Sequence, residues 1–188
     1  ILSNDDSGIE RASEIIKSGG LVALPTETVY GLGADATNPK AIELIYSTKG
    51  RPSMNPLIIH VYENKDVFEI ADKNEIAQDL SSEFWPGPLT LILNKKKKKI
   101  FNGDKRLSKI GIRIPKNNAM LNLLNCIKKP LATTSANLHR EKNERNIENL
   151  KILSNKDLKT GWAGTLTAIV DKPANAFLAS FNLVLFFL

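Results

Sequence analysis

The chain has 188 residues, of which 42% are hydrophobic and 24% are charged, so it can build one core of ordinary size without disulfide staples. Its net charge of +6 favours contact with the phosphates of nucleotides or nucleic acids. A general enrichment in Lys and Asn would explain the excess equally well. The single cysteine excludes an internal disulfide, the apolar stretch at 181–188 is too short for a membrane span, and the N-terminus lacks a signal-peptide pattern. We therefore expect a cytoplasmic protein.

The first half of the chain shows helical and strand periodicities in turn. Apolar residues at helical spacing predict the first helix, which Gly19 and Gly20 end. Short apolar runs bounded by proline predict strands, and Pro39 suits the first turn of a helix. The predicted elements are a helix at 7–18, a strand at 21–24, a helix at 39–47 and a strand at 57–61, with a turn-rich connection at 25–34.

The second half continues the alternation, with a lysine run at 95–99 that we expect in a loop. Residues 138–160 are polar and allow no prediction. The predicted elements are helices at 74–84 and 117–127 and strands at 89–93, 110–114, 131–134, 165–170 and 182–187. Because strands and helices alternate imperfectly, we predict an α/β fold with a mixed sheet, formed by a single domain over residues 1–188.

The stretch 25–34, P-T-E-T-V-Y-G-L-G-A, is the densest group of candidate ligand-binding residues. Its hydroxyls can donate and accept hydrogen bonds, and its glycines allow a ligand to approach the backbone. An ordinary turn would have the same composition. Gly31, Gly33 and Ala36 also form G-x-G-x-x-A, but a dinucleotide fingerprint should follow its strand at once, and here residues 25–30 intervene.

Two further clusters follow predicted elements. Lys49 and Arg51 flank a glycine just after a helix, where two cations can face a polyphosphate or simply complement the helix C-terminus. The strand at 131–134 runs into Thr134-Ser135-Ala136-Asn137, small polar groups that suit a phosphate or ribose but also an ordinary turn or helix cap. No G-x-x-x-x-G-K-[ST] loop is present, so any ATP must be held in another way.

Arg113 and His60 are polar residues next to apolar strand runs. Arg113 within Ile110–Ile114 indicates a carboxylate or phosphate partner, or else the solvent face of an edge strand. His60 is open to the same two interpretations, with a structural role favoured. The W-P-G-P-L-T segment at 85–90 is typical of a structural junction. The lysine run at 95–99 is typical of a solvated loop or, less often, of an RNA contact.

Six motifs together resemble the YrdC-like family. They are P-T-E-T-V-Y-G-L-G at 25–33, K-G-R-P at 49–52, N-P-L at 55–57, W-P-G-P-L-T at 85–90, R-I-P at 113–115 and T-S-A-N at 134–137. They occur in the family's order and cover residues 8–140. The resemblance implies a twisted mixed sheet flanked by helices, with a basic concave cavity.

The resemblance also implies an activity, threonylcarbamoyl-AMP synthesis from L-threonine, bicarbonate and ATP for tRNA modification, with Mg²⁺ carried by ATP and no metal site of the protein itself. Lys49 and Arg51 would be catalytic. The implied ATP contacts are Lys49, Arg51, Asn55, Ser135 and Asn137. The implied threonine contacts are Thr28, His60, Arg113, Thr134 and Thr167. A downstream transferase system and tRNA or double-stranded RNA are the implied partners.

The C-terminal part departs from the family pattern. Leu166–Asp171 is the nearest match to the family's Pro-Ser-Thr-(Val/Ile)-Val-Asp strand, and Thr167 keeps one hydroxyl while Ala168 loses another. Residues 177–188 contain no Arg, which removes an expected nucleotide contact. This departure and the basic charge favour an alternative, a non-catalytic RNA-binding module of the same fold. A carbamoyl-transfer domain of hydrogenase maturation proteins is disfavoured by the single cysteine.

Overall fold

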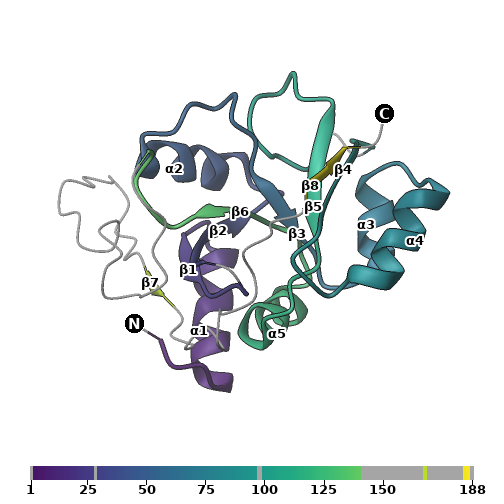
Figure 1. Ribbon diagram of the computed structural model, residues 1–188. Coiled ribbons are helices and arrows are strands. Elements are labelled where there is room, and N and C mark those ends of the chain that lie inside the picture. Colours follow the sequence, from purple (N-terminus) through teal and green to yellow (C-terminus); the bar gives the residue numbers. More distant parts are fainter. Residues whose placement is uncertain (1, 28, 97–98, 141–166, 169–183, 187–188) are drawn as a thin grey trace.

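The computed structural model describes residues 2–27, 29–96 and 99–140 and two short strands at 167–168 and 184–186 (Figure 1). The helices are α1 (Asp6–Lys17), α2 (Pro39–Lys49), α3 (Asn64–Ile70), α4 (Glu75–Phe84) and α5 (Asn118–Ile127). The strands are β1 (Val22–Leu24), β2 (Gly31–Asp35), β3 (Ile58–His60), β4 (Thr90–Asn94), β5 (Lys109–Arg113), β6 (Leu131–Ser135), β7 (Thr167–Ala168) and β8 (Val184–Phe186). None of the helices in these ranges is long and apolar enough to cross a membrane.

Side-chain caps fix where the helices begin. Asp5, Asn38, Asn74 and Asn117 each accept a backbone N–H of the first turn of α1, α2, α4 and α5. The last turn of α2 ends at Gly50, whose φ of 60° lies in the left-handed region that glycine adopts without strain. This turn matters for function because it sends the chain directly from Lys49 to Arg51.

The strands form one mixed sheet in the order β7-β1-β2-β6-β3-β5-β4-β8. The central pairs β2–β6, β3–β6 and β4–β5 are antiparallel, whereas β3 and β5 are parallel. β5 is therefore an interior strand, with β3 on one side and β4 on the other. The structure confirms the predicted α/β class and mixed sheet.

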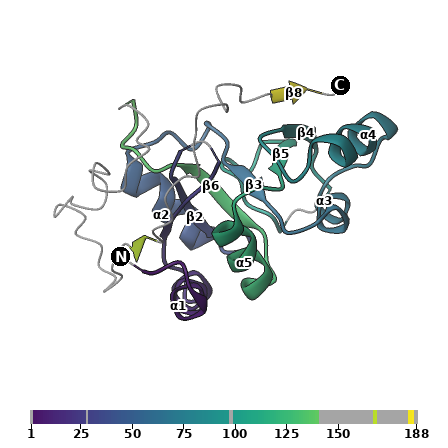
Figure 2. The same cartoon turned by 60° about the horizontal axis from the view of Figure 1, so that its bottom comes forward.

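Helices pack on both faces of the sheet (Figure 2). On one face, α2, α3 and α4 cover alternate strand residues such as Leu32, Ile59 and Ile112. On the other face, α1 and α5 bury Val22, Leu24 and Leu131. The sheet thus has two apolar layers, and polar strand residues lie beyond the edge of the α1–α5 layer.

Two elements were not predicted from the sequence. β2 lies in the stretch predicted to be turn-rich, and all five of its residues are buried between β1 and β6. Gly33 serves close packing, since a Cβ there would lie 2.7 Å from Cδ1 of Leu24. The other element, α3, is only 7 residues long and begins with a capping box of Glu63 and Asp66. Neither a glycine-rich strand nor such a short helix gives clear periodicity.

Candidate functional site

Part of the sheet face that carries α1 and α5 is not covered by any described helix. The pairing register places Thr133, Ile58, Gly111 and Ile92 in a row across β6, β3, β5 and β4. Ser135 follows Thr133 by two residues and therefore lies on the same face. Ser135, Ile58, Gly111 and Ile92 are partly exposed, whereas the strand residues under α1 and α5 are buried. Gly111 adds no side chain to this surface. The uncovered area, called the open face below, has polar groups at two ends.

Lys49 forms the first end. Its ammonium group donates hydrogen bonds to the backbone carbonyls of Ser135 and Asn137, and its Nζ lies 3.4 Å from Oδ1 of Asn137. The backbone N–H of His139 donates to the carbonyl of Lys49 at 3.1 Å. The predicted K-x-R and S-x-N motifs are therefore in direct contact through Lys49, although they are far apart in the sequence.

The surroundings of Lys49 disfavour its positive charge. The side chain is buried, and burial together with the nearby Arg51 guanidinium lowers the pKa of Lys49 to about 8. An anionic ligand would relieve both effects, because it supplies the negative charge that three oxygen dipoles supply only in part. This end therefore suits a phosphate.

Arg51 is held by the loop that follows it. Its Nε and Nη2 donate to the carbonyls of Asn55 and Pro56 at 3.4 and 3.3 Å. Tyr46 of α2 donates from its hydroxyl to the carbonyls of Asn55, at 2.8 Å, and of the fully buried Asn102, at 3.3 Å. The loop around Arg51 is thus tied to α2 and to the β4–β5 connection, which the sequence did not indicate.

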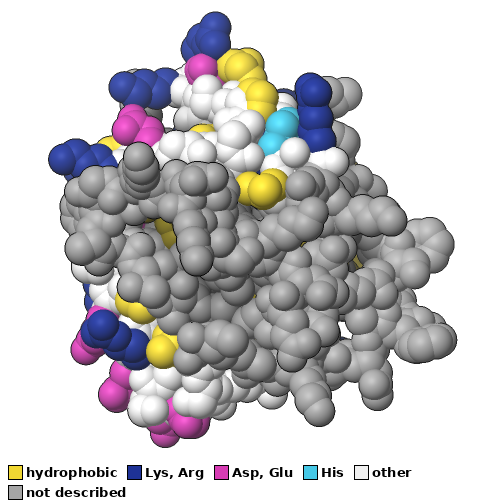
Figure 3. Space-filling model, turned by 90° about the vertical axis from the view of Figure 1, so that its left-hand side faces the viewer, with side chains coloured by type: hydrophobic (Ala, Val, Ile, Leu, Met, Phe, Trp, Pro, Cys, Tyr) yellow, Lys and Arg dark blue, Asp and Glu magenta, His cyan; other side chains and the backbone are white. Residues whose placement is uncertain are grey.

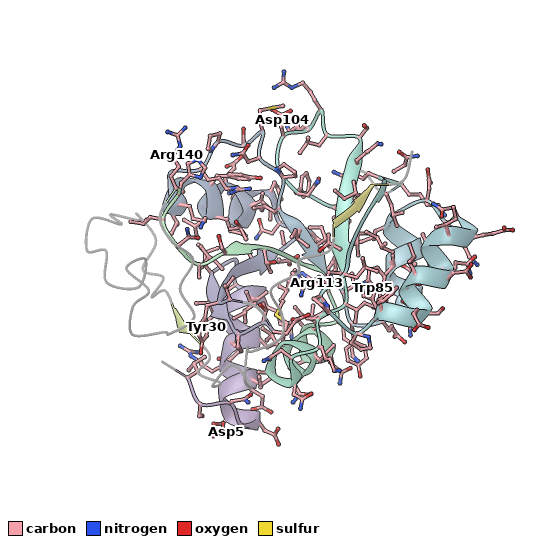
Figure 4. The ribbon with its side chains drawn as sticks, in the orientation of Figure 1. Asp5, Tyr30, Trp85, Asp104, Arg113 and Arg140 are labelled. Carbon is pink, nitrogen blue, oxygen red and sulfur yellow. The ribbon has the colours of Figure 1, made fainter. Side chains whose placement is uncertain are left out.

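Arg113 forms the second end, near Trp85 (Figure 4). The residue is buried in β5, an interior strand, so of the two interpretations left open by the sequence the solvent face of an edge strand is excluded. Its Nε donates to the carbonyl of Gly87 at 3.0 Å, and its Nη2 pairs with Oε1 of Glu27 at 2.6 Å. The W-P-G-P segment therefore anchors this arginine in addition to joining α4 to β4.

His60 lies beside Arg113, as its register partner on β3. Its Nδ1 is 2.8 Å from Oγ1 of Thr133, and its Nε2 is buried with no hydrogen-bond partner in the part of the chain that the structure describes. Burial and the neighbouring Arg113 charge lower the pKa of His60 to about 3. The imidazole is therefore neutral at physiological pH and can serve a ligand only as an uncharged donor or acceptor.

Glu27 was not among the predicted site residues. Its Oε1 pairs with Arg113, and the backbone N–H of Lys116 lies 3.5 Å from the same oxygen. Its Oε2 is buried without a hydrogen-bond partner among the described residues. The available sequence signal was the pairing rule itself, because a buried arginine needs a carboxylate and Glu27 stands within the densest motif.

The other predicted site residues fall into three groups. Ser135 and Asn137 meet Lys49, and Asn55 meets Arg51 through its carbonyl. Thr134 follows Thr133 in β6, so its side chain projects from the opposite face of the sheet. Thr28 lies outside the described residues, and of Thr167 only the backbone is placed, in β7 beside β1. The roles predicted for all these side chains stay predictions.

Basic side chains are exposed in the connection between β4 and β5. In Figure 3, Lys and Arg side chains stand around the upper edge of the molecule, with a histidine among them. Lys96 and Lys99 of the lysine run are exposed, as are Lys105 and Arg106 in the same β4–β5 connection. Among the described residues, no group of three His, Cys, Asp or Glu could hold a metal ion.

Comparison with known proteins identifies the family. The Sua5/YciO/YrdC family model, described as "Telomere recombination", matches residues 14–161. The chain belongs to this family. Its fold agrees, since a crystal structure of Sua5 from Pyrococcus abyssi in complex with L-threonine superposes with a TM-score of 0.76 at 34% identity, covering 89% of this chain and 47% of that one.

Two relatives in the Sua5/YciO/YrdC family are named threonylcarbamoyl-AMP synthase. The protein of Pyrococcus abyssi is 41% identical over 133 residues, which are 69% of this chain and 38% of that protein. The protein of Bacillus subtilis is 42% identical over 142 residues, 73% of this chain and 40% of its own length. The chain therefore spans less than half the length of these relatives.

Proposed function

We propose that this chain is a threonylcarbamoyl-AMP synthase, a nucleotidyltransferase that makes threonylcarbamoyl-adenylate and pyrophosphate from L-threonine, bicarbonate and ATP for tRNA modification. The observation that carries the proposal is the presence of two recognition groups near opposite ends of β6. Lys49, held by Ser135 and Asn137, suits a phosphate. Arg113, buried and paired on only one side with a carboxylate, suits an amino acid.

The spacing of the two ends supports this pairing. Lys49 reaches Ser135 at one end of β6, and His60 is opposite Leu131 at its other end. At 3.3 Å per residue, these positions are about 13 Å apart. An amino acid and a phosphate chain can lie end to end over such a distance. The Pyrococcus abyssi relative, whose structure is described as a complex with L-threonine, supports the choice of amino acid.

At the first end of the open face, called the phosphate end below, Lys49 and Arg51 would act on the triphosphate of ATP. Charge on the phosphate oxygens grows as pyrophosphate leaves, and fixed cations stabilise that charge more than they stabilise the substrate. Asn55, Ser135 and Asn137 would complete the ATP contacts. Mg²⁺ would enter with ATP.

At the second end, called the amino-acid end below, Arg113 would bind the substrate carboxylate through the part of its guanidinium that Gly87 and Glu27 leave free. Neutral His60 would meet the hydroxyl or amine, and Thr28, Thr134 and Thr167 would add hydroxyl contacts. The amine of threonine would take up CO₂ or bicarbonate as a carbamate, whose oxygen attacks the α-phosphate of ATP. No covalent protein intermediate is required, so catalysis would rest on positioning and electrostatics.

A pyrophosphate-release assay tests this proposal. ATP and bicarbonate are supplied with and without L-threonine, to the wild type and to Lys49→Ala. We expect threonine-dependent release that falls by about 10²- to 10³-fold in Lys49→Ala. Arg140→Ala, which removes a cation that no site contact involves, is the control and should retain release. Threonine-independent release, or none in the wild type, would contradict the proposal.

The exposed cations of the β4–β5 connection favour a second candidate, a non-catalytic RNA-binding module. Lys96, Lys99 and Lys105 are exposed there, and the nearby Asp104 is already paired with Arg106 at 2.9 Å. This alternative would be supported if the chain released no pyrophosphate but bound RNA. The double variant Lys96→Gln/Lys99→Gln should then weaken RNA binding, whereas Lys49→Ala should not. We further propose that residues 1–188 form one YrdC-like domain with a basic concave cavity, acting in the cytoplasm beside a transferase system.

A further inference from the structure

Two buried polar atoms at the amino-acid end have no hydrogen-bond partner among the described residues. They are Oε2 of Glu27 and Nε2 of His60, and the only other such atom, Oγ of Ser13, belongs to α1. An unsatisfied buried polar atom costs about 1–3 kcal/mol, so folded proteins rarely keep one without a reason. Two of them beside one arginine indicate a polar ligand that completes both.

The guanidinium of Arg113 connects these two atoms. Glu27 pairs with its Nη2 at 2.6 Å, and His60 is its register partner on the adjacent strand. Its Nε is occupied by the carbonyl of Gly87 at 3.0 Å. Its Nη1 makes no hydrogen bond within the described ranges. Arg113 thus has a free donor, its ion-pair partner Glu27 has a free acceptor, and its neighbour His60 has a free ring nitrogen among the described residues.

The geometry of the Glu27–Arg113 pair is unlike that of a purely structural ion pair. A structural pair gains most when both carboxylate oxygens meet two guanidinium nitrogens in a fork. Here Arg113 turns Nε toward the Gly87 carbonyl and gives Glu27 only Nη2. One oxygen of Glu27 is satisfied and the other, Oε2, is left for a further donor.

We propose that Glu27 recognises the α-ammonium group of the amino-acid substrate, with Oε2 as the acceptor, while Nη1 of Arg113 takes the α-carboxylate. This inference rests on the proposed function and adds the residue that selects for an amine. Arg113 alone would bind any carboxylate of suitable size. A carboxylate beside it rejects acids that lack the amine, because these leave Oε2 buried and unpaired. Since the ion pair and a zwitterion are each neutral overall, binding buries no net charge.

Calorimetric titration with two ligands tests the proposal. L-Threonine carries the amine, and 3-hydroxybutanoate has a hydrogen in its place. We expect Glu27→Gln to weaken threonine binding by about 10- to 100-fold, the value of one charge-assisted hydrogen bond, while binding of 3-hydroxybutanoate stays within about threefold. Glu14→Gln, at an exposed glutamate of α1, is the matched control and should leave both affinities unchanged.

Each other outcome contradicts the proposal in a distinct way. If Glu27→Gln weakens both ligands equally, Glu27 only supports Arg113. If the variant binds threonine more tightly, the Glu27 carboxylate occupies the place of the substrate carboxylate. If the wild type does not bind threonine, the proposed function fails as well. Glu27→Asp keeps the negative charge but moves the carboxylate away from the ligand by one methylene group. It must therefore also weaken the binding of threonine more than the binding of 3-hydroxybutanoate. This variant replaces Glu27→Gln in the test if Glu27→Gln does not fold.

Discussion

The two ends of the open face are built in different ways. At the phosphate end, Lys49 and Arg51 are held by backbone carbonyls of two loops. At the amino-acid end, Arg113 and His60 stand on neighbouring strands, and side chains meet side chains. The phosphate end therefore depends on loop shape, whereas the amino-acid end depends on sheet register and on burial. The two ends should respond differently to substitution and to pH.

The largest effect on stability is expected at the amino-acid end. Arg113→Ala leaves Glu27 without its partner in a buried position and should lower the free energy of unfolding by about 3–5 kcal/mol in urea titrations. Glu27→Ala/Arg113→Ala should recover part of the loss, because it removes the uncompensated charge. Arg106→Ala, which breaks an exposed ion pair, should cost far less stability, because solvent screens such a pair. If Arg113→Ala and Arg106→Ala lowered the free energy of unfolding equally, the buried ion pair would contribute no more to stability than the exposed one.

A pH dependence of stability should also map to this end. The pKa of His60 is about 3 in the folded chain, against about 6.5 when unfolded, so the unfolded state binds more protons between these values. Stability should therefore fall by about 1.4 kcal/mol per pH unit from this group as pH drops below about 6. Unfolding curves of His60→Asn should have a shallower slope from pH 6 to 4. A slope in His60→Asn equal to that of the wild type would contradict this assignment.

ATP binding at the phosphate end should weaken at alkaline pH. The pKa of Lys49 is lowered to about 8, so its positive charge is largely present at pH 7 and largely lost at pH 9. ATP affinity should fall by up to about tenfold between these pH values. Lys49→Arg stays protonated and should show a flat profile by calorimetry, whatever its absolute affinity. A wild-type profile as flat as that of Lys49→Arg would mean that Lys49 does not contact the phosphates.

The smallest effect is expected from the support of the phosphate end. Tyr46→Phe removes the hydroxyl that donates to the carbonyls of Asn55 and Asn102, and should cost about 0.5–1.5 kcal/mol of stability. It should also raise the KM for ATP more than the KM for threonine, since the loop around Arg51 loses a tie. Tyr62→Phe, at an exposed tyrosine, should change neither quantity. A larger rise in the threonine KM would contradict the division into two ends.

Most of the fold could be predicted from the sequence because its elements are periodic and clearly ended. Apolar periodicity together with glycine and proline signals placed α1, α2, α4 and α5 close to their observed bounds. The prediction failed where glycine serves packing instead of turning. Gly31 and Gly33 lie inside β2, and local sequence does not show that Leu24 will fill the space beside Gly33.

The candidate site could be predicted only in part, for a related reason. Lys49, Ser135 and Asn137 were grouped by motif resemblance, and the structure brings them into contact. For Arg113, the sequence left a solvent-facing position open beside a carboxylate or phosphate partner, because a sequence does not reveal that β5 is an interior strand. Glu27 was missed since its partner, Arg113, is 86 residues away.

The most direct test of the central claim, that both ends act on one pair of substrates, is detection of the joint product. The chain is incubated with ATP, ¹³C-labelled bicarbonate and ¹⁵N-labelled threonine, and the products are examined by mass spectrometry. We predict one adenylate species that contains both labels, absent in Lys49→Ala and in Arg113→Ala. AMP derivatives without threonine nitrogen, or an unchanged product in either variant, would contradict the assignment of the two ends to one reaction.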